Sequence, residues 1–266
     1  MSSERRPDGD RTTARAARAR TGGGAPDRVA RGRVTSDRAA AHRAAVRAGR
    51  LSPVRVLLAD RAYVALRDRI VTLAIRPGEP IDEDWIGAEL QIGRTPVREA
   101  IKRLTLENLV IVFPRRGTFA TEINTSDLTH ISDVRKALEG HAAYRAAQRI
   151  TPARRAELGG LLDELARSES LGVGDDLGAL MALDTRVHRF VYACAENPYL
   201  AATLDRYLNL SLRIWYLALD RLPHLGARVR EHDELLHAID AGEADRASSI
   251  IADHIETFER EIRAAL

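Results

Sequence analysis

Residues 94–104 read RTPVREAIKRL, and this stretch decides how the surrounding chain folds. Its large apolar residues recur at helical spacing, as Val97, Ile101 and Leu104. Pro96 suits the first turn of a helix, because its missing N–H would have no partner there, and Thr95 is the expected N-cap. The pattern therefore predicts a short helix with one apolar face that ends near Asn108.

Outward from this helix, the sequence predicts two preceding helices and a following hairpin. Apolar residues at helical spacing indicate helices over residues 54–75 and 82–90, with a break rich in proline and glycine between them. β-prone residues at 109–112 and 118–123 flank a basic tip at 114–117, which is typical of a β-hairpin. Three helices followed by a two-stranded wing form a docking geometry for the major groove of DNA.

Seven residues of this module are candidates for DNA contact. They are Arg94, Thr95, Arg98, Lys102, Arg115, Arg116 and Gly117. Two stand at the helix N-terminus, where free N–H groups and the helix dipole favour a phosphate, and two lie one turn apart on a flank that can face a groove. The arginines of the wing tip can reach the backbone or the minor groove. Taken singly, each of these basic residues is more often a solvated surface charge. The prediction of DNA binding therefore rests on the order of the helices and the wing along the chain.

This order of features resembles the GntR family of bacterial regulators. The resemblance rests on residues 94–104, on Pro77-Gly78 before them and on residues 114–119 after them, and it covers about residues 55–123. It implies a winged helix-turn-helix domain, here residues 53–123, that binds a short palindromic operator as a homodimer.

The family also implies roles for single residues. Arg94 and Arg98 would contact bases or adjacent phosphates, and Thr95 would contact a phosphate. Gly117 would let the wing approach DNA closely. Gly93 stands where the family usually has serine or threonine, so one side-chain contact to phosphate is expected to be absent.

After Asn124 the sequence predicts helices to the end of the chain. Their expected ranges are 126–150, 151–168, 176–195, 198–221, 227–241 and 243–264, with a flexible break at Gly172–Gly174. Helices of this length with short links favour an antiparallel all-α bundle, so the fold class is mostly α with a small β-hairpin.

Four residues of the predicted bundle could hold one metal ion. Asp184 and His188 lie four apart on one helix and point the same way, while His232 and His254 lie on later helices. Facing helices of a bundle can bring such side chains together. Three imidazoles and a carboxylate suit zinc first, with nickel or manganese as alternatives. Each histidine alone is more often a surface or satisfied core residue.

The same residues resemble the FCD-type ligand-binding domain of the FadR subgroup, over about residues 125–264. The matching segments are Asp184-Thr185-Arg186-Val187-His188, Glu231-His232 and His254. The resemblance implies that all four candidates are metal ligands. Val187 replaces the usual aromatic residue, which changes packing and leaves the ligand set intact.

Arg135 also fits that family's pattern, in which this arginine often faces the effector cavity. A guanidinium beside a metal gives an anion two anchors, which implies a small organic acid as effector. The alternative is a surface ion pair between Arg135 and Glu139 at i+4. Arg213 is a weaker candidate for the same cavity. In this family the effector more often releases the operator, so a repressor is expected.

Two other readings stay open. A metal-dependent hydrolase could use an Asp/His₃ site, but the sequence has no HExxH, nucleophile elbow, P-loop or Gly-rich nucleotide motif, so an enzyme is not predicted. Alternatively, the metal could be purely structural and the bundle could serve only to dimerise.

Composition and charge set the remaining limits. Residues 1–52 hold thirteen arginines against five acidic residues and few large apolar side chains, which predicts a disordered basic tail that either contacts phosphates or is inert. The other 214 residues carry a net charge of −5 within a total of +3. Cys194 alone cannot form an intrachain disulfide and is expected to be buried. No signal peptide or membrane span is predicted, so a cytoplasmic protein is expected.

We expect the substitution Arg98→Ala to abolish specific operator binding while leaving the fold intact. An arginine that reads guanine contributes about 1–3 kcal/mol of discrimination between bases. The measurement is a titration of the chain's own promoter DNA at fixed salt, with circular dichroism to check folding. A variant that bound this DNA as tightly as the unmodified chain would contradict the assignment.

Overall fold

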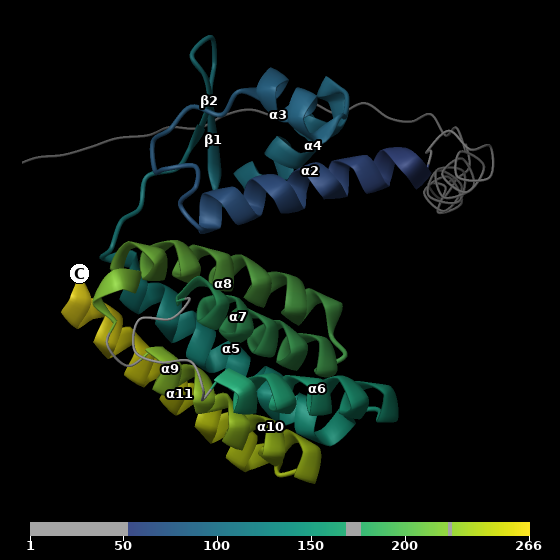
Figure 1. The fold of residues 1–266 in the computed structure, drawn as a ribbon, viewed down its shortest axis with the longest axis vertical. Coiled ribbons are helices and arrows are strands. Elements are labelled where there is room, and N and C mark those ends of the chain that lie inside the picture. The colour runs from purple at the N-terminus through teal and green to yellow at the C-terminus, as the bar shows by residue number, and fades with distance from the viewer. Residues whose placement is uncertain (1–52, 169–176, 223–224) are drawn as a thin grey trace, which may run out of the picture. The chain divides into compact units, whose positions relative to one another are not determined.

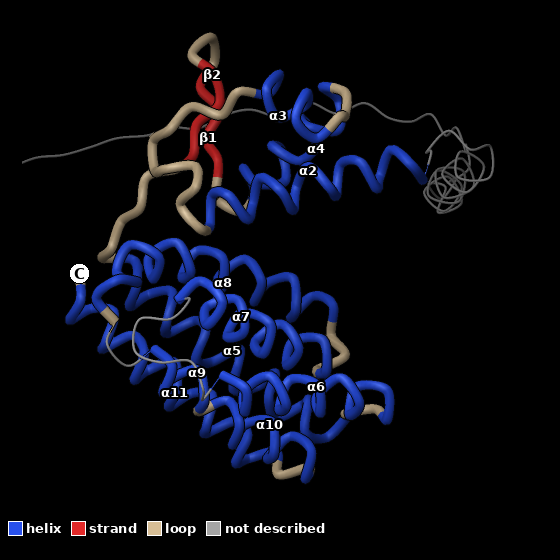
Figure 2. Tube along the Cα trace, in the orientation of Figure 1, coloured by secondary structure: helices blue, strands red, loops and turns tan. Residues whose placement is uncertain are grey.

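The computed structural model describes residues 53–168, 177–222 and 225–266 (Figure 1). Helices dominate, and the described strands form one two-stranded antiparallel sheet (Figure 2). The predicted fold class is confirmed. The Arg-rich tail over residues 1–52 and the break predicted at Gly172–Gly174 lie outside the described residues.

Three helices and a hairpin form the N-terminal part. The elements are α2 (Pro53–Val71), α3 (Glu83–Leu90), α4 (Arg94–Leu106), β1 (Val110–Phe113) and β2 (Gly117–Ala120). The two strands pair antiparallel, with Val110 opposite Ala120 and Phe113 opposite Gly117. This order matches the predicted winged helix-turn-helix.

Helix α2 ends at Val71, four residues before the predicted end. Leu73 has a φ of 61°, so the backbone turns left-handed there and the helix cannot continue. The N–H of Ile75 then donates to the carbonyl of Arg69 at 3.0 Å and closes the helix end. Ile75 is buried, which is why the apolar pattern runs past the helix itself.

Helix α4 begins at Arg94, and Gly93 is its N-cap. The prediction that Thr95 caps this helix was therefore wrong, because Thr95 lies inside the first turn. The preceding helix α3 has a side-chain cap, since the carboxylate of Asp82 accepts hydrogen bonds from the N–H groups of Asp84 and Trp85.

The apolar face of α4 holds the N-terminal part together. It packs against α2, α3 and the start of the hairpin. The buried cluster comprises Ala62, Leu66, Ile70, Ile75, Ile81, Ile86, Val97, Ala100, Ile101, Leu104, Leu109, Val110 and Ala120. The three apolar residues of α4 predicted to share a face all belong to this cluster.

Seven described helices form the C-terminal bundle. They are α5 (Asp127–Arg149), α6 (Pro152–Ser168), α7 (Leu177–Cys194), α8 (Pro198–Ala218), α9 (Leu225–Arg230), α10 (His232–Ala241) and α11 (Ala244–Ala265), with a short 3-10 turn at Leu219–Arg221. Helix α5 is central, because it contacts α7, α8, α10 and α11 (Figure 1).

The single helix predicted over residues 227–241 is two helices in the structure. Helix α9 ends at Arg230 and α10 begins at His232, and Glu231 between them keeps a right-handed helical backbone, with φ −57° and ψ −22°. Apolar spacing does not reveal this boundary, because the backbone at Glu231 stays helical and the apolar pattern continues across it.

The bundle has its own large apolar core, which includes Cys194 as a buried free thiol. Burial raises the pKa of this thiol to about 11, in line with an inert core residue. In residues 53–168, 177–222 and 225–266, none of the helices is long and apolar enough to cross a membrane. The domain boundaries at 53–123 and 125–264 stay predictions.

We expect Leu104→Ala to lower the free energy of unfolding by about 2–5 kcal/mol, because it leaves a cavity in the N-terminal core. The side chain of Leu104 is fully buried, whereas that of Leu106 in the same helix is 70% exposed. Urea unfolding of Leu106→Ala is the matched control and should change by less than about 0.5 kcal/mol. Equal losses in the two variants would contradict the described burial of α4.

Candidate metal centre and nucleic-acid interface

Three helices of the bundle bring four buried potential ligands to one point. Asp184 and His188 come from α7, His232 begins α10, and His254 lies in α11. One ligand atom from each residue lies within 4.8 Å of the others. All four side chains are at least 95% buried. We call these four residues the tetrad; they are the four that the sequence predicted as metal ligands.

The free atoms of the tetrad face one another. The Nε2 atoms of His188, His232 and His254 lie 3.7, 3.7 and 3.8 Å from carboxylate oxygens of Asp184. Among the residues that the structure describes, these three Nε2 atoms and Oδ2 of Asp184 have no hydrogen-bond partner. A buried polar atom without a partner costs about 1–3 kcal/mol, so four at one point indicate a missing ligand.

The opposite nitrogen of each ring, Nδ1, faces an acceptor. His188 Nδ1 lies 2.6 Å from Oε2 of Glu139, His232 Nδ1 lies 3.0 Å from the carbonyl of Val229, and His254 Nδ1 lies 3.1 Å from Oε2 of Glu231. Because a carbonyl and an ionised carboxylate only accept hydrogen bonds, each Nδ1 carries the proton. In a neutral ring, Nε2 then keeps its lone pair and can bind a metal.

Local electrostatics favours these protonation states. Burial alone would raise the pKa of Glu139, but Arg135 and the adjacent imidazole outweigh burial and lower it to about 2. Burial also opposes ionisation of Glu231, yet the hydrogen bond with His254 brings its pKa below the ordinary value. Burial and the neighbouring rings hold the pKa of His232 well below its ordinary value, which keeps this ring neutral.

Arg135 forms the ion pair with Glu139 that the sequence offered as an alternative, but the pair is buried. Arg135 Nε lies 2.6 Å from Oε1 of Glu139, and both side chains are 1% exposed. The guanidinium also lies over the ring of Trp215, 4.8 Å from its centroid. Glu139 thus links Arg135 to His188, because its other oxygen contacts that ring.

Buried donors near this ion pair remain free. Within the described part of the chain, Nη2 of Arg135, the hydroxyl of Tyr192 and Nε1 of Trp215 have no hydrogen-bond partner. The charges of Glu139 and Arg135 both act on the Tyr192 hydroxyl, and its ring lies beside that of His188. Such a group of donors can serve an anion with several oxygen atoms.

Arg213 points elsewhere. Its guanidinium donates to Oγ1 of Thr121 at 2.7 Å and to the carbonyl of the same residue. Burial lowers its pKa to about 10. These contacts are to Thr121 and not to the tetrad, so the assignment of Arg213 to the effector site stays a prediction.

Glu139 and Glu231 have positioning roles that the sequence did not reveal. Glu139 is 49 residues from His188, so no spacing rule connects them. In the sequence, Glu231 stood out only as the residue before His232 in the segment that resembles the FCD domain. Its Oε2 lies 3.1 Å from Nδ1 of His254, and its other carboxylate oxygen forms an ion pair with Arg228.

In the N-terminal part, helix α4 presents its basic residues to solvent. The side chains of Arg94 and Arg98 are each 69% exposed, and both pair with carboxylates of α3. Arg94 contacts Asp84 through two nitrogens, and Nε of Arg98 lies 2.9 Å from Glu83. These arginines are therefore not locked in the core. Thr95 and Lys102 are exposed as well.

The wing tip is also exposed and has an unusual backbone. Arg115 and Gly117 have positive φ values of 63° and 106°, and Arg116 lies between them. Gly117 suits this conformation because it lacks a Cβ. The wing is joined to α3 and α4 through Glu83, which accepts a hydrogen bond from Thr118 in β2 at 3.2 Å and pairs with Arg98.

A winged helix-turn-helix with exposed arginines, followed by a helical bundle, defines a DNA-binding transcriptional regulator. Residues 58–120 match the model of the bacterial regulatory proteins of the gntR family, and residues 130–257 match the FCD domain. The chain belongs to the GntR family and carries an FCD domain, as its sequence predicted.

Known regulators resemble the chain over most of their length. The HTH-type transcriptional repressor RspR of Escherichia coli K12 is 25% identical over 77% of this chain and 88% of its own. The Nta operon transcriptional regulator of Aminobacter aminovorans is 29% identical over 70% and 85%. The solved structure of E. coli McbR/YncC shares the fold, with a TM-score of 0.68 and 20% identity over 78% and 97%. These families and relatives are regulators rather than enzymes, which confirms that prediction.

We expect Glu139→Gln to destabilise the protein by about 3–5 kcal/mol, because it leaves Arg135 buried without a counter-ion. Guanidinium unfolding of the metal-free protein measures the change. The matched control is Glu256→Gln, which removes the exposed ion pair between Glu256 of α11 and Lys136 of α5 and should leave stability almost unchanged. A loss no larger than that of the control would contradict the role assigned to the buried pair.

Proposed function

We propose that the chain is a metal-dependent, effector-responsive repressor. It binds a palindromic operator as a dimer and releases it when a small organic acid binds near a divalent ion held by the tetrad. The observation that carries the proposal is the convergence of four buried ligand atoms that have no hydrogen-bond partner among the described residues. We assign the protein to the cytoplasm, where its DNA would lie.

The tetrad fits a metal in distance and in chemistry. Zinc binds imidazole nitrogen at about 2.0–2.1 Å, so two ligands of a tetrahedral ion are roughly 3.3 Å apart. Carboxylate oxygens of Asp184 already lie 3.7–3.8 Å from each of the three Nε2 atoms. Three neutral imidazoles and one carboxylate suit zinc, nickel or manganese. The contacts of each Nδ1 hold the rings in the required orientation.

The free donors beside the tetrad support an acid as effector. Arg135 would offer Nη2 to a carboxylate, while Tyr192 and Trp215 would orient other oxygen atoms of the ligand. When bound, the ion would supply a Lewis-acidic position for a carboxylate oxygen. Glu139 contacts both Arg135 and His188. An anion bound to the guanidinium would therefore act through Glu139 on His188, a proposed metal ligand.

The exposed arginines of α4 support the proposal that this helix binds DNA. In the free protein they pair with carboxylates of α3, and phosphates or base edges can replace these partners. An effector changes operator affinity only if it binds one arrangement of the DNA-binding domains more tightly than another. The relative RspR is a repressor by name, which supports the same sign here.

We expect His188→Ala to abolish retention of one divalent ion per chain. Metal analysis after dialysis measures this directly. In the unmodified chain, an ion at 100 times its dissociation constant should add about 2.7 kcal/mol to the free energy of unfolding, and the variant should lose this gain. His130→Ala, which removes an exposed histidine of α5, is the control and should retain both. Equal metal content in the two variants would sink the assignment of the tetrad.

A structural ion is the second candidate, because four protein ligands already complete a tetrahedral zinc site. A mobility shift with promoter DNA, titrated with small organic acids, separates the two functions. A sensing ion predicts that chelation removes the acid response while the protein stays folded. A structural ion predicts that chelation unfolds the bundle.

A further inference from the structure

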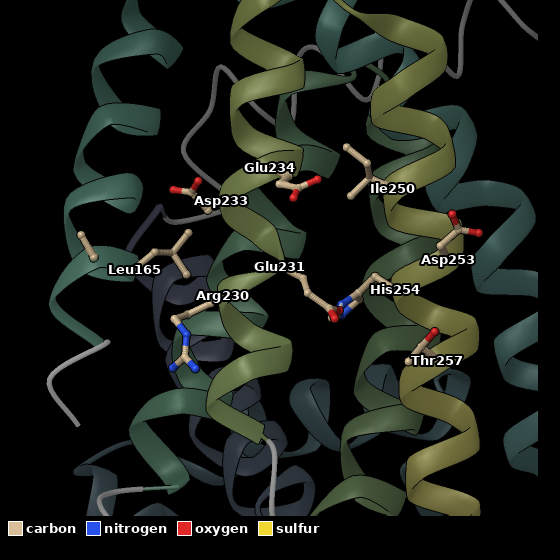
Figure 3. A pocket seen from close by; sticks show the side chains of 10 residues that line it. Leu165, Arg230, Glu231, Asp233, Glu234, Ile250, Asp253, His254 and Thr257 are labelled. Atoms are coloured by element: carbon tan, nitrogen blue, oxygen red, sulfur yellow. Dashed lines mark hydrogen bonds and ion pairs between the residues drawn. The ribbon is translucent and has the colours of Figure 1, made fainter. Parts of the chain in front are cut away.

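A surface pocket opens beside the tetrad (Figure 3). Its volume is about 650 Å³. It is lined by Leu165, Ala166, Arg230, Glu231, Asp233, Glu234, Ile250, Asp253, His254 and Thr257. We call it the acidic pocket, because it contains four carboxylates and one guanidinium.

Of the pocket's carboxylates, that of Glu231 contacts His254. In Figure 3, the side chain of Glu231 reaches toward the imidazole, while Asp253 precedes it in α11. Asp233 and Glu234 are exposed at the start of α10. With neutral imidazole, these side chains and Arg230 leave the pocket with a net charge of −3.

His254 separates the acidic pocket from the tetrad. It is 5% exposed and belongs to both. Its Nδ1 faces Glu231 at the pocket, and its Nε2, which has no hydrogen-bond partner in the described residues, lies 3.8 Å from Asp184. One imidazole ring therefore has the acidic pocket on one side and the ligand atoms of the tetrad on the other.

We propose that the acidic pocket is the entry route by which a divalent cation reaches the tetrad. The proposal rests on the metal site proposed above and adds the path of loading. A cation collected by the carboxylates passes His254, which becomes its ligand through Nε2. Glu231 holds the ring through Nδ1 during this passage.

The charge of the pocket gives the route its selectivity. A cleft lined by charges of one sign raises the local concentration of the opposite ion and speeds association by 10- to 1,000-fold. Carboxylate oxygens can also replace waters of a hydrated cation one at a time. The same charges repel an organic anion, so the metal and an acidic effector reach the buried site by different paths.

The experiment uses the full chain, stripped of metal by dialysis against a chelator, and mixes it with Co²⁺ in a stopped-flow instrument. Trp215 reports binding by quenching, because its ring lies 4.7 Å from that of Phe258, which stacks on His254. Release is measured by mixing the loaded protein with excess chelator. The second tryptophan, Trp85, lies in α3.

The first variant neutralises three carboxylates of the pocket: Asp233→Asn, Glu234→Gln and Asp253→Asn. Glu231 is left unchanged because it holds a tetrad ring. We expect association at low ionic strength to slow about tenfold and to lose most of its salt dependence. The matched control has the same net charge and removes exposed carboxylates outside the pocket: Asp133→Asn, Asp220→Asn and Asp245→Asn. An equal slowing in both variants would overturn the proposal.

The second variant, Thr257→Phe, narrows the pocket without changing its charge and without adding a tryptophan. An obstacle on a path leaves both end states unchanged, so association and release should slow by the same factor while the dissociation constant stays constant. Unchanged rates would show that the ion enters elsewhere. If the unmodified chain bound no Co²⁺, the proposed metal site itself would be wrong. If Co²⁺ bound with the same rates in the unmodified chain and in both variants, only the proposed entry route would be wrong.

Discussion

The free Nε2 atoms of three histidines and the carboxylate of Asp184 impose the constraint on which the bundle depends. Burying four such atoms side by side is unfavourable unless something binds them, and each ring keeps its orientation because an acceptor holds its Nδ1. Helices α7, α10 and α11 must meet at one point to satisfy this arrangement. At the start of α10, His232 supplies one of these atoms, and the preceding residue, Glu231, accepts from the ring of His254 in α11.

Helix α5 connects the parts of this site. Glu139 accepts from Arg135 with one oxygen and from His188 with the other, so one carboxylate serves both a cation and a ring of the tetrad. A buried ion pair is weak evidence for stability, since desolvation of both charges offsets their attraction. Its position between a free guanidinium nitrogen and a tetrad histidine instead supports the proposed role in effector recognition.

Periodicity and motif order sufficed to predict the fold class. Asp184 and His188 are four apart on one helix, which is a local signal, whereas bundle geometry together with the resemblance to the FCD domain joined the later histidines to them. The contacts behind the rings could not be foreseen, because Glu139 and His188 meet only through the packing of α5 on α7. The predicted helix ends were wrong where backbone geometry decided them, as at Leu73 and Gly93.

Arg94 and Arg98 pair with carboxylates of α3, and these pairs affect how strongly DNA binding would depend on salt. Each guanidinium already has an anionic neighbour within the protein, so contact with a phosphate exchanges one anion for another. Such internal partners reduce the net positive charge that the helix brings to the duplex. Affinity should then depend less steeply on salt than a count of arginines suggests, which leaves a larger share of binding to the recognition of base edges.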